Sequence, residues 1–225
     1  MPSRASTKQP RTPAEQPPPP PEGAPGPSGT KLQILEAALQ TLKAKGFAGA
    51  SARAIASVGG FNQALIFYHF GSVRNLLLAV FDLISERRMS EYGPAFEQAR
   101  SASELVGLAH TIYRDDLERG YITVLGEMVS GGVTDAELGA AVAARVEPWI
   151  EMVERKLRQM LTGTPLQLLA SPRDIAFALV ALYFGVDMLS HLQRDQTRAQ
   201  SLLDLGASLA VVVDTILPTQ PEETP

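Results

Sequence analysis

The chain has 225 residues, 45% of them hydrophobic, and a formal net charge of −4 at pH 7. This length suits one small and one medium domain with a buried core. It contains no cysteine, which excludes disulfides and thiolate metal sites. The longest apolar run, residues 175–186, is shorter than the roughly 20 residues that cross a bilayer, and the N-terminus lacks a signal-peptide core. We therefore expect a cytoplasmic protein with no membrane partner.

Both ends of the chain are predicted to be disordered. Residues 1–29 include ten prolines, five of them consecutive, and show no apolar periodicity. The basic residues of this tail, which are Arg4, Lys8 and Arg11, could contact DNA phosphates. An inert extension explains the tail equally well. Residues 218–225 form a second short tail.

Residues 51–70 have the pattern of two short helices joined by a tight turn. Ser51 can cap the first helix, and the pair Gly59-Gly60 permits a turn through positive φ. Asn62 can cap the second helix, which Gly71 ends. This pattern predicts a helix-turn-helix, in which the second helix enters the major groove of DNA.

Further helices are predicted on both sides of this motif. Upstream, Thr30 and Gln33 can form a capping box for a helix that runs to about Lys45 and stops at Gly46. Downstream, Ser72 can cap a fourth helix. The predicted DNA-binding domain therefore covers residues 30–81.

Residues 30–82 resemble the N-terminal domain of the TetR/AcrR family of bacterial transcriptional regulators. The shared features fall in register: IL-AA in the first helix, R-x-I-A in the second, the turn glycine, and the aromatic-His-Phe that ends the third. The resemblance implies a homodimer that binds a palindromic operator, with a small-molecule effector that changes the spacing of the two recognition helices. It also implies a repressor.

The predicted DNA contacts fall into two groups. Gln63 and Ala64, in the first turn of the recognition helix, are expected at base edges. The phosphate contacts are expected from Ser51, Arg53, Tyr68, His69 and Arg74, with Asn62 and Phe67 on the same surface. The chain departs from the family pattern at three positions. The family usually has Lys where this chain has Gln63, often has Tyr in place of Phe67, and usually has Lys in place of Val73.

Charge is distributed unevenly along the chain. Residues 30–81 contain five Lys or Arg and one Glu, whereas residues 82–225 contain 12 Lys or Arg and 21 Asp or Glu. A basic N-terminal domain on an acidic body is expected if only that domain approaches DNA.

The rest of the chain, residues 82–217, is predicted to form a helical domain for effector binding and dimerisation, which brings the fold to about nine helices with no strand. Helix starts are expected at Ser101, Thr134, Ser171 and Thr197, and a stop at Gly131-Gly132. Pro148 should kink the long helix that contains it.

Two apolar stripes in the last two helices predict the dimer interface. Apolar stripes are more often intramolecular core, but the family resemblance favours pairing between two copies. The interface residues are Leu182, Gly185, Leu189, Leu202, Leu205, Gly206, Leu209 and Val213.

An apolar or aromatic effector is expected in the helical body, because ligand sites are concave, mostly apolar and carry few polar groups. The same residue types are more often simple core. The candidate pocket residues are His110, as a polar anchor, with Tyr113, Met128, Trp149, Met152, Phe177, Tyr183, Phe184 and Met188.

No nucleophile elbow, P-loop or clustered metal ligands occur in the sequence. We therefore predict no enzyme activity, no cofactor and no metal site. The prediction is an all-α DNA-binding transcriptional regulator. The alternative is an all-helical small-molecule-binding or protein-interaction module whose helix-turn-helix does not read DNA.

Overall fold

Nine helices and their connecting turns make up the part of the chain that the computed structural model describes, which is residues 27–164, 171–193 and 197–216. The predicted tails lie outside these residues, except for residues 27–29. Within the described ranges every regular element is a helix, as the sequence predicted.

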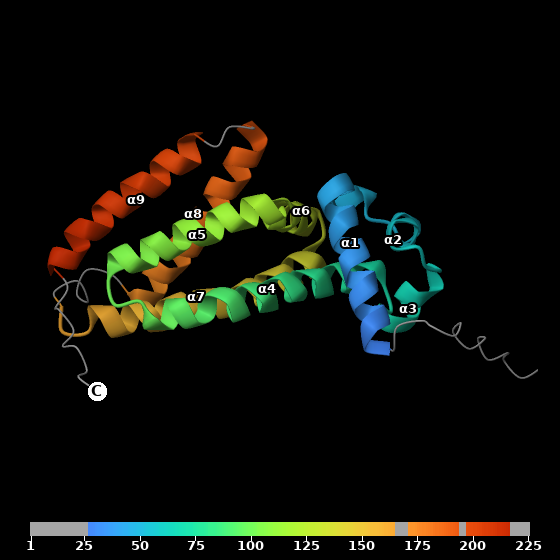
Figure 1. Cartoon of the computed structure of the whole chain (residues 1–225), viewed down its shortest axis with the longest axis horizontal. Coiled ribbons are helices and arrows are strands. Elements are labelled where there is room, and N and C mark those ends of the chain that lie inside the picture. Colours follow the sequence, from blue (N-terminus) through green and yellow to red (C-terminus); the bar gives the residue numbers. More distant parts are fainter. Residues whose placement is uncertain (1–26, 165–170, 194–196, 217–225) are drawn as a thin grey trace, which may run out of the picture.

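The first three helices form one end of the molecule (Figure 1). They are α1 (Pro27–Gly49), α2 (Ala52–Gly59) and α3 (Ala64–Phe70). As predicted, Ser51 caps α2 by accepting a hydrogen bond from the Ala54 N–H, and Gly71 ends α3. The backbone at Gly46 leaves the helical region with φ 67°, so the last turn of α1 is set off from the rest at the predicted stop.

The other six helices form the body. They are α4 (Val73–Gln98), α5 (Ala102–Arg119), α6 (Tyr121–Thr134), α7 (Ala136–Leu161), α8 (Pro172–Gln193) and α9 (Thr197–Ile216). Helix α8 packs on α7, and α9 packs on α5. Asp214 near the end of α9 accepts the backbone N–H groups of Ala102 and Ser103, which fastens α9 to the N-terminus of α5.

One hydrophobic core runs through both the DNA-binding end and the body. Ile34 and Leu42 of α1, Leu76 of α4, and Val124 and Met128 of α6 are fully buried members of the same cluster. Helix α4 also runs without interruption across residue 81, the boundary that the sequence suggested. The two predicted domains therefore share their interior.

Several predicted helix ends are wrong by a few residues. Helix α1 begins at Pro27 rather than Thr30, and Gln33 donates a hydrogen bond of 3.0 Å to the Gly59 carbonyl instead of closing a capping box. Helix α6 continues through Gly131-Gly132 to Thr134, and Asp135 caps α7. In this pair of helices, a Cβ at Gly132 would come within 2.9 Å of the Gly139 backbone. Gly132 thus serves close helix packing rather than termination.

Proline does not interrupt the long helices. Helix α7 is a single helix through Pro148, and α4 through Pro94. Each proline lacks the N–H that would donate to the preceding turn, and each helix continues past it.

By length and composition, α9 is able to cross a membrane, and so are α3 and α4 if they are taken together as a bent pair. The sequence prediction considered only uninterrupted apolar runs and so passed over α9, which contains Asp204 and Asp214. Only 11% of the apolar window in α9 is buried within this chain.

Candidate nucleic-acid interface and internal cavity

The turn before α3 fixes the orientation of the recognition helix. Gly60 adopts the left-handed conformation with φ 67°. A side chain at Gly59 would collide with the Phe61 ring and the Ala37 methyl group. Asn62 then accepts a hydrogen bond of 2.9 Å from the Ala64 N–H. These three residues make the turn tight and specify where α3 begins.

One face of α3 is exposed and the opposite face is buried. Ile66 is completely buried in the core, whereas Phe67 is 50% exposed and Tyr68 is 78% exposed. Ala64 is exposed next to them, at the i and i+3/i+4 spacing that places residues on one side of a helix. Gln63, immediately before α3, is also exposed. Gln63, Ala64, Phe67 and Tyr68, all predicted DNA-contact residues, thus share one exposed surface.

The predicted phosphate contacts differ in their availability. Arg53 is exposed on α2, and Ser51 uses its side chain as the α2 cap. The His69 ring is half-buried and packs edge-on against Tyr68, with 4.9 Å between the ring centroids.

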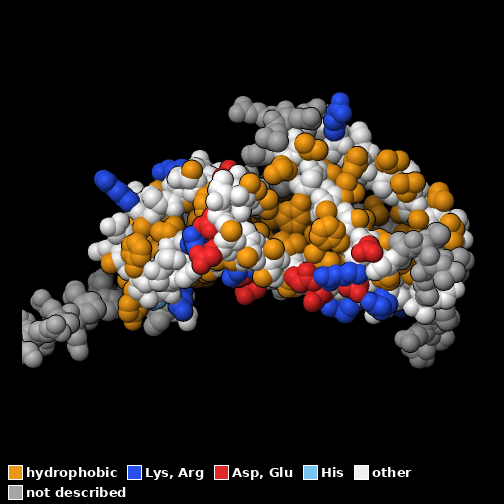
Figure 2. Space-filling model, turned by 180° about the vertical axis from the view of Figure 1, so that it is seen from behind, with side chains coloured by type: hydrophobic (Ala, Val, Ile, Leu, Met, Phe, Trp, Pro, Cys, Tyr) orange, Lys and Arg blue, Asp and Glu red, His pale blue; other side chains and the backbone are white. Residues whose placement is uncertain are grey.

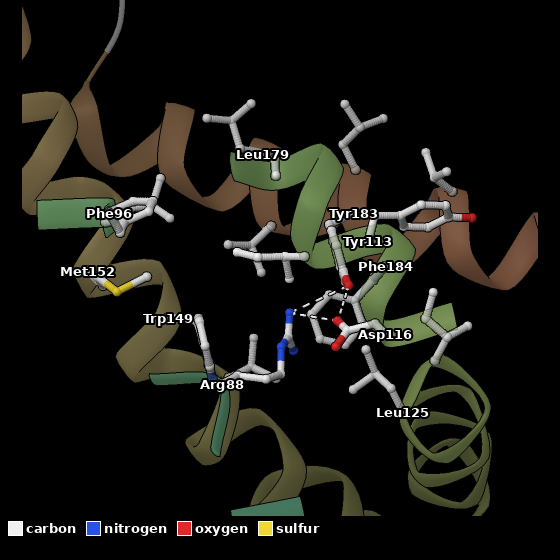
Figure 3. A pocket seen from close by; sticks show the side chains of 18 of the residues that line it. Arg88, Phe96, Tyr113, Asp116, Leu125, Trp149, Met152, Leu179, Tyr183 and Phe184 are labelled. Atoms are coloured by element: carbon white, nitrogen blue, oxygen red, sulfur yellow. Dashed lines mark hydrogen bonds and ion pairs between the residues drawn. The ribbon is translucent and has the colours of Figure 1, made fainter. Parts of the chain in front are cut away.

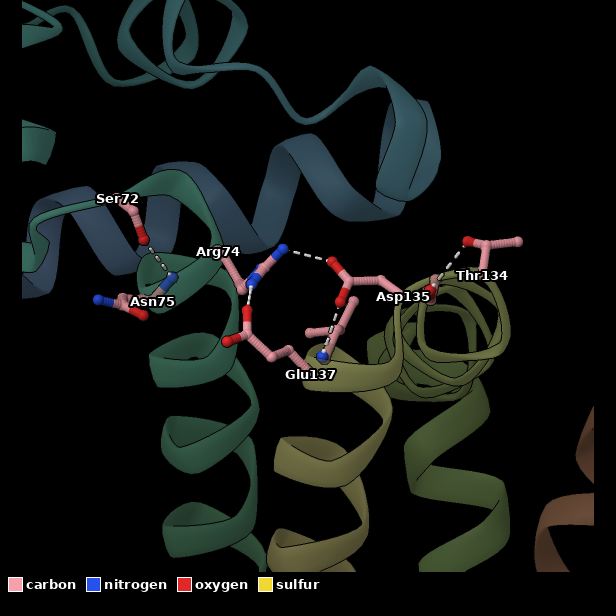
Figure 4. Close-up of polar contacts among 8 residues, drawn as sticks. Ser72, Arg74, Asn75, Thr134, Asp135 and Glu137 are labelled. Atoms are coloured by element: carbon pink, nitrogen blue, oxygen red, sulfur yellow. Dashed lines mark hydrogen bonds and ion pairs between the residues drawn. The ribbon is translucent and has the colours of Figure 1, made fainter.

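Arg74, a predicted phosphate contact, is partly exposed and is ion-paired within the protein. Its guanidinium is ion-paired with Asp135 and with Glu137, both at the start of α7 (Figure 4). The carboxylate of Asp135 also caps α7 by accepting the Leu138 N–H. In this conformation Arg74 joins the DNA-binding end to the body, and it must leave these carboxylates to reach a phosphate.

A mostly apolar cavity of about 320 Å³, partly open to solvent, lies between α4, α5, α6, α7, α8 and α9 (Figure 3). Five of the nine predicted pocket residues line it, namely Tyr113, Trp149, Met152, Tyr183 and Phe184. The other four do not. Met128 is completely buried in the shared core, and Phe177 and Met188 are exposed. His110 lies outside the lining, although its Nε2 is buried and has no hydrogen-bond partner within the described part of the chain.

The charged groups of the cavity lining are Arg88 and Asp116, which the sequence prediction missed. The Arg88 Nη2 lies 2.9 Å from the Asp116 carboxylate, and the Tyr183 hydroxyl donates to the same carboxylate. The guanidinium also stacks over Trp149, 4.8 Å from the ring centroid. Burial raises the pKa of Asp116, and the Arg88 charge opposes that rise.

A sequence signal for these two residues was present. Arg88 lies four and seven positions after Ile84 and Phe81, and Asp116 lies three and four positions after Tyr113 and Ile112. Both charges therefore interrupt an apolar helical stripe, which places them on the face that packs inward. A buried charge requires a partner, so the two interruptions could have been paired.

Helix α6 connects the cavity to the DNA-binding end. Tyr121 and Leu125, in its first half, line the cavity. Two residues after Leu125, Glu127 accepts a hydrogen bond of 2.6 Å from the Phe47 N–H, at the break in α1. The Lys43 ammonium of α1 lies 5.4 Å from the Tyr121 ring centroid. A shift of α6 at the cavity would thus act directly on α1.

The predicted dimer residues lie on α8 and α9, and most are exposed. Leu182, Leu189, Leu202, Leu205 and Leu209 are all at least 41% exposed, and Gly185, Gly206 and Val213 are half-buried. Figure 2 shows hydrophobic side chains gathered over this part of the surface. Leu182, Leu202 and Gly206 also line the cavity, so the cavity wall and the exposed apolar face share residues.

A helix-turn-helix joined to a helical body defines the class of protein as a DNA-binding regulator. Residues 34–80 match the model of the bacterial regulatory proteins of the tetR family. Over these residues the chain carries the DNA-binding domain of the TetR family of transcriptional regulators.

Solved structures share the fold over nearly their whole length. The fatty acid degradation regulator FadR from Bacillus halodurans superposes with a TM-score of 0.68 at 16% identity, covering 83% of this chain and 96% of that one. A TetR-family regulator from Cytophaga hutchinsonii gives 0.68 at 15% identity, covering 85% and 96%. One from Legionella pneumophila gives 0.64 at 20% identity, covering 80% and 97%. No curated protein sequence is significantly similar to this chain.

Proposed function

We propose that this regulator is a repressor that binds a palindromic operator as a homodimer and is released when a small molecule occupies the cavity. The observation that carries the proposal is the arrangement of α6, which lines the cavity with Tyr121 and Leu125 and binds the end of α1 through Glu127. A molecule that fits the cavity only when α6 moves would bind the DNA-free conformation better, which is the requirement for a switch.

The DNA-binding surface supports the first part of the proposal. The open face of α3 and its preceding turn present Gln63, Ala64, Phe67 and Tyr68, with Arg53 beside them on α2. An amide, a phenol hydroxyl and a guanidinium are suitable donors for base edges and phosphates. A single short helix reads few base pairs, so useful specificity calls for two copies on two half-sites.

The second copy is proposed to cover α8 and α9. Their exposed leucines form a contiguous apolar face of the kind that monomeric proteins rarely leave open. A bilayer is a poorer partner for α9, because a membrane surrounds a helix on every side, whereas α5 already occupies one side of α9 and Asp214 is bonded there. A symmetric pairing of two α8–α9 faces would bury the same residues from each copy.

The proposal is tested by a mobility shift with the purified full-length chain and DNA that flanks its own gene. Sequence-specific binding at physiological salt, with a stoichiometry of two chains for each site, would support a dimeric regulator acting on its own operator. Binding that is equally weak on all DNA of the same length would favour the alternative, a helical module whose helix-turn-helix does not read sequence.

A further inference from the structure

The chemistry of the cavity specifies the class of molecule that it takes. Its lining is mostly apolar, and its only ion pair among the described residues is that of Arg88 with Asp116. Asp116 is 2% exposed, and the side chain of Arg88 is 15% exposed. Both charges are therefore held inside the protein, and they neutralise each other.

This pair leaves hydrogen-bond donors without acceptors. Within the described residues, every polar contact of the Arg88 guanidinium passes through Nη2, which meets Asp116 and, at 3.4 Å, the Tyr183 hydroxyl. The Arg88 Nε is buried and has no acceptor among the residues that the structure describes. A guanidinium carries five N–H donors and no acceptor, so Arg88 keeps donors that a further acceptor atom could use.

A ligand charge of either sign is disfavoured by the same pair. An anion drawn to Arg88 would lie beside the Asp116 carboxylate, and a cation drawn to Asp116 would lie beside the Arg88 guanidinium. Separating the pair to accommodate a charged group would leave one of the two charges buried without its partner, which is strongly destabilising. Trp149 and Tyr183 already bind Arg88 through their ring faces, so they are not a vacant cage for another cation.

We propose that the effector is an uncharged, mostly apolar molecule carrying a carbonyl-type hydrogen-bond acceptor, which binds beside Arg88 while the ion pair with Asp116 stays intact. This inference rests on the proposed function of the cavity as the effector site. The acceptor oxygen is supplied to a guanidinium that has spare N–H donors, and the apolar remainder packs against the residues in Figure 3, among them Phe96, Leu125 and Met152.

The test uses four probes that share one ring system and differ in one group. They are acetylnaphthalene, which is an uncharged ketone, ethylnaphthalene, naphthoate, and naphthylmethylammonium. Each is titrated into the full-length protein at pH 8 by calorimetry. The ketone should bind about ten-fold or more tighter than ethylnaphthalene, which has no acceptor, because a hydrogen bond from a charged donor is among the stronger ones. Both charged probes should bind more weakly than the ketone.

Two variants separate ligand recognition from simple structural support. Asp116→Asn keeps the size of the side chain and leaves Arg88 unneutralised, so naphthoate should become the preferred probe. The double variant Arg88→Met with Asp116→Leu removes both charges together, and the ketone should lose its advantage over ethylnaphthalene. Circular dichroism confirms that each variant is folded, and a residue that only supported the fold would not reverse the order of the probes.

The possible outcomes distinguish this inference from the proposed function. Naphthoate or the ammonium probe binding the wild type most tightly would overturn the uncharged-effector inference and leave the cavity as the effector site. Equal binding of the ketone and ethylnaphthalene would overturn the role of Arg88 as donor. If operator binding is established and none of the four probes binds at millimolar concentration, the cavity is not an effector site for molecules of this size, and both proposals fail.

Discussion

Arg74, in the first turn of α4, is ion-paired with Asp135, the residue that caps α7. The same guanidinium contacts Glu137, two residues further along. This arrangement ties a residue expected on DNA phosphate to two carboxylates of the body. If Arg74 binds a phosphate as predicted, DNA and the start of α7 compete for it.

Releasing Arg74 should strengthen DNA binding. Exposed ion pairs of this kind contribute at most about 1 kcal/mol to stability, so Asp135→Asn with Glu137→Gln should remain folded, and Asn still caps α7. We expect DNA affinity to rise by about two- to ten-fold and the salt dependence of binding to steepen by about one phosphate contact. Fluorescence anisotropy across a salt series measures both.

The loss of two negative charges would by itself attract DNA, so a control is required. The same double substitution is made with Arg74→Ala, and the gain in affinity and in salt slope should disappear. A gain that persists without Arg74 would show that this side chain makes no phosphate contact.

Gln63 and Tyr68 should affect DNA binding in different ways. Gln63→Ala should cost about 1 to 3 kcal/mol on the preferred site and relax selectivity at one position, because an amide reads a base edge. Tyr68→Ala should weaken binding to every sequence by the same factor, because a phosphate contact carries no sequence information. Both side chains are exposed, so folding is unaffected. Binding to a library of single-base variants separates the two patterns, and uniform loss for Gln63→Ala would assign it to a phosphate.

A charge on the α8–α9 face should dissociate the dimer. Leu209 is 55% exposed in the single chain, so Leu209→Glu should fold, but it would place like charges against each other across a two-fold axis. We expect a folded monomer with much weaker operator binding, measured by sedimentation velocity. Val133→Glu is the matched control, since Val133 is 80% exposed on α6, and it should stay dimeric. A dimeric Leu209→Glu protein would place the interface elsewhere.

The buried carboxyl of Asp116 should give stability a specific pH dependence. Burial raises its pKa in the folded chain, with Arg88 opposing, so between the unfolded and folded pKa values the folded state holds the extra proton. Its contribution to stability is then greatest below the unfolded pKa and falls as pH rises through the folded pKa.

Denaturant unfolding of the wild type and of Asp116→Asn at a series of pH values isolates this effect. The free energy of unfolding of the wild type minus that of the variant should decrease as pH rises above the ordinary range of an aspartate, and then level off. A difference that increases with pH would mean that Arg88 outweighs burial and that the folded pKa is lowered.

The fold was predictable where the deciding interactions are local. Ser51 and Ser72 cap their helices, and Gly60 and Gly71 take left-handed or other positive-φ conformations at the predicted turns. Each of these depends on a few neighbouring residues. Gly132 was misassigned because its role depends on Gly139 in the next helix, and no pattern within α6 reveals that approach.

The candidate site was predictable only in part, for the same reason. The aromatic residues of the cavity follow helical periodicity, so five of nine were placed correctly on its wall. Periodicity predicts which face of a helix is apolar, but it does not predict what packs against that face. Met128 and Phe177 were therefore indistinguishable from lining residues. Arg88 with Asp116, and Arg74 with Asp135, join residues 28 and 61 positions apart on different helices. Such pairs become visible only when the helices are packed.

The shared core has a practical consequence for engineering. Ile34 and Leu42 are buried together with Val124 and Met128, and Phe47 depends on Glu127 for a backbone hydrogen bond. A fragment cut near residue 81 would expose the apolar side of α1 to water and lose that bond. A chimera that joins the DNA-binding end to another protein's ligand-binding domain would therefore have to include α6 as well. Otherwise, the new domain would need a helix with an equivalent apolar surface on which α1 can pack.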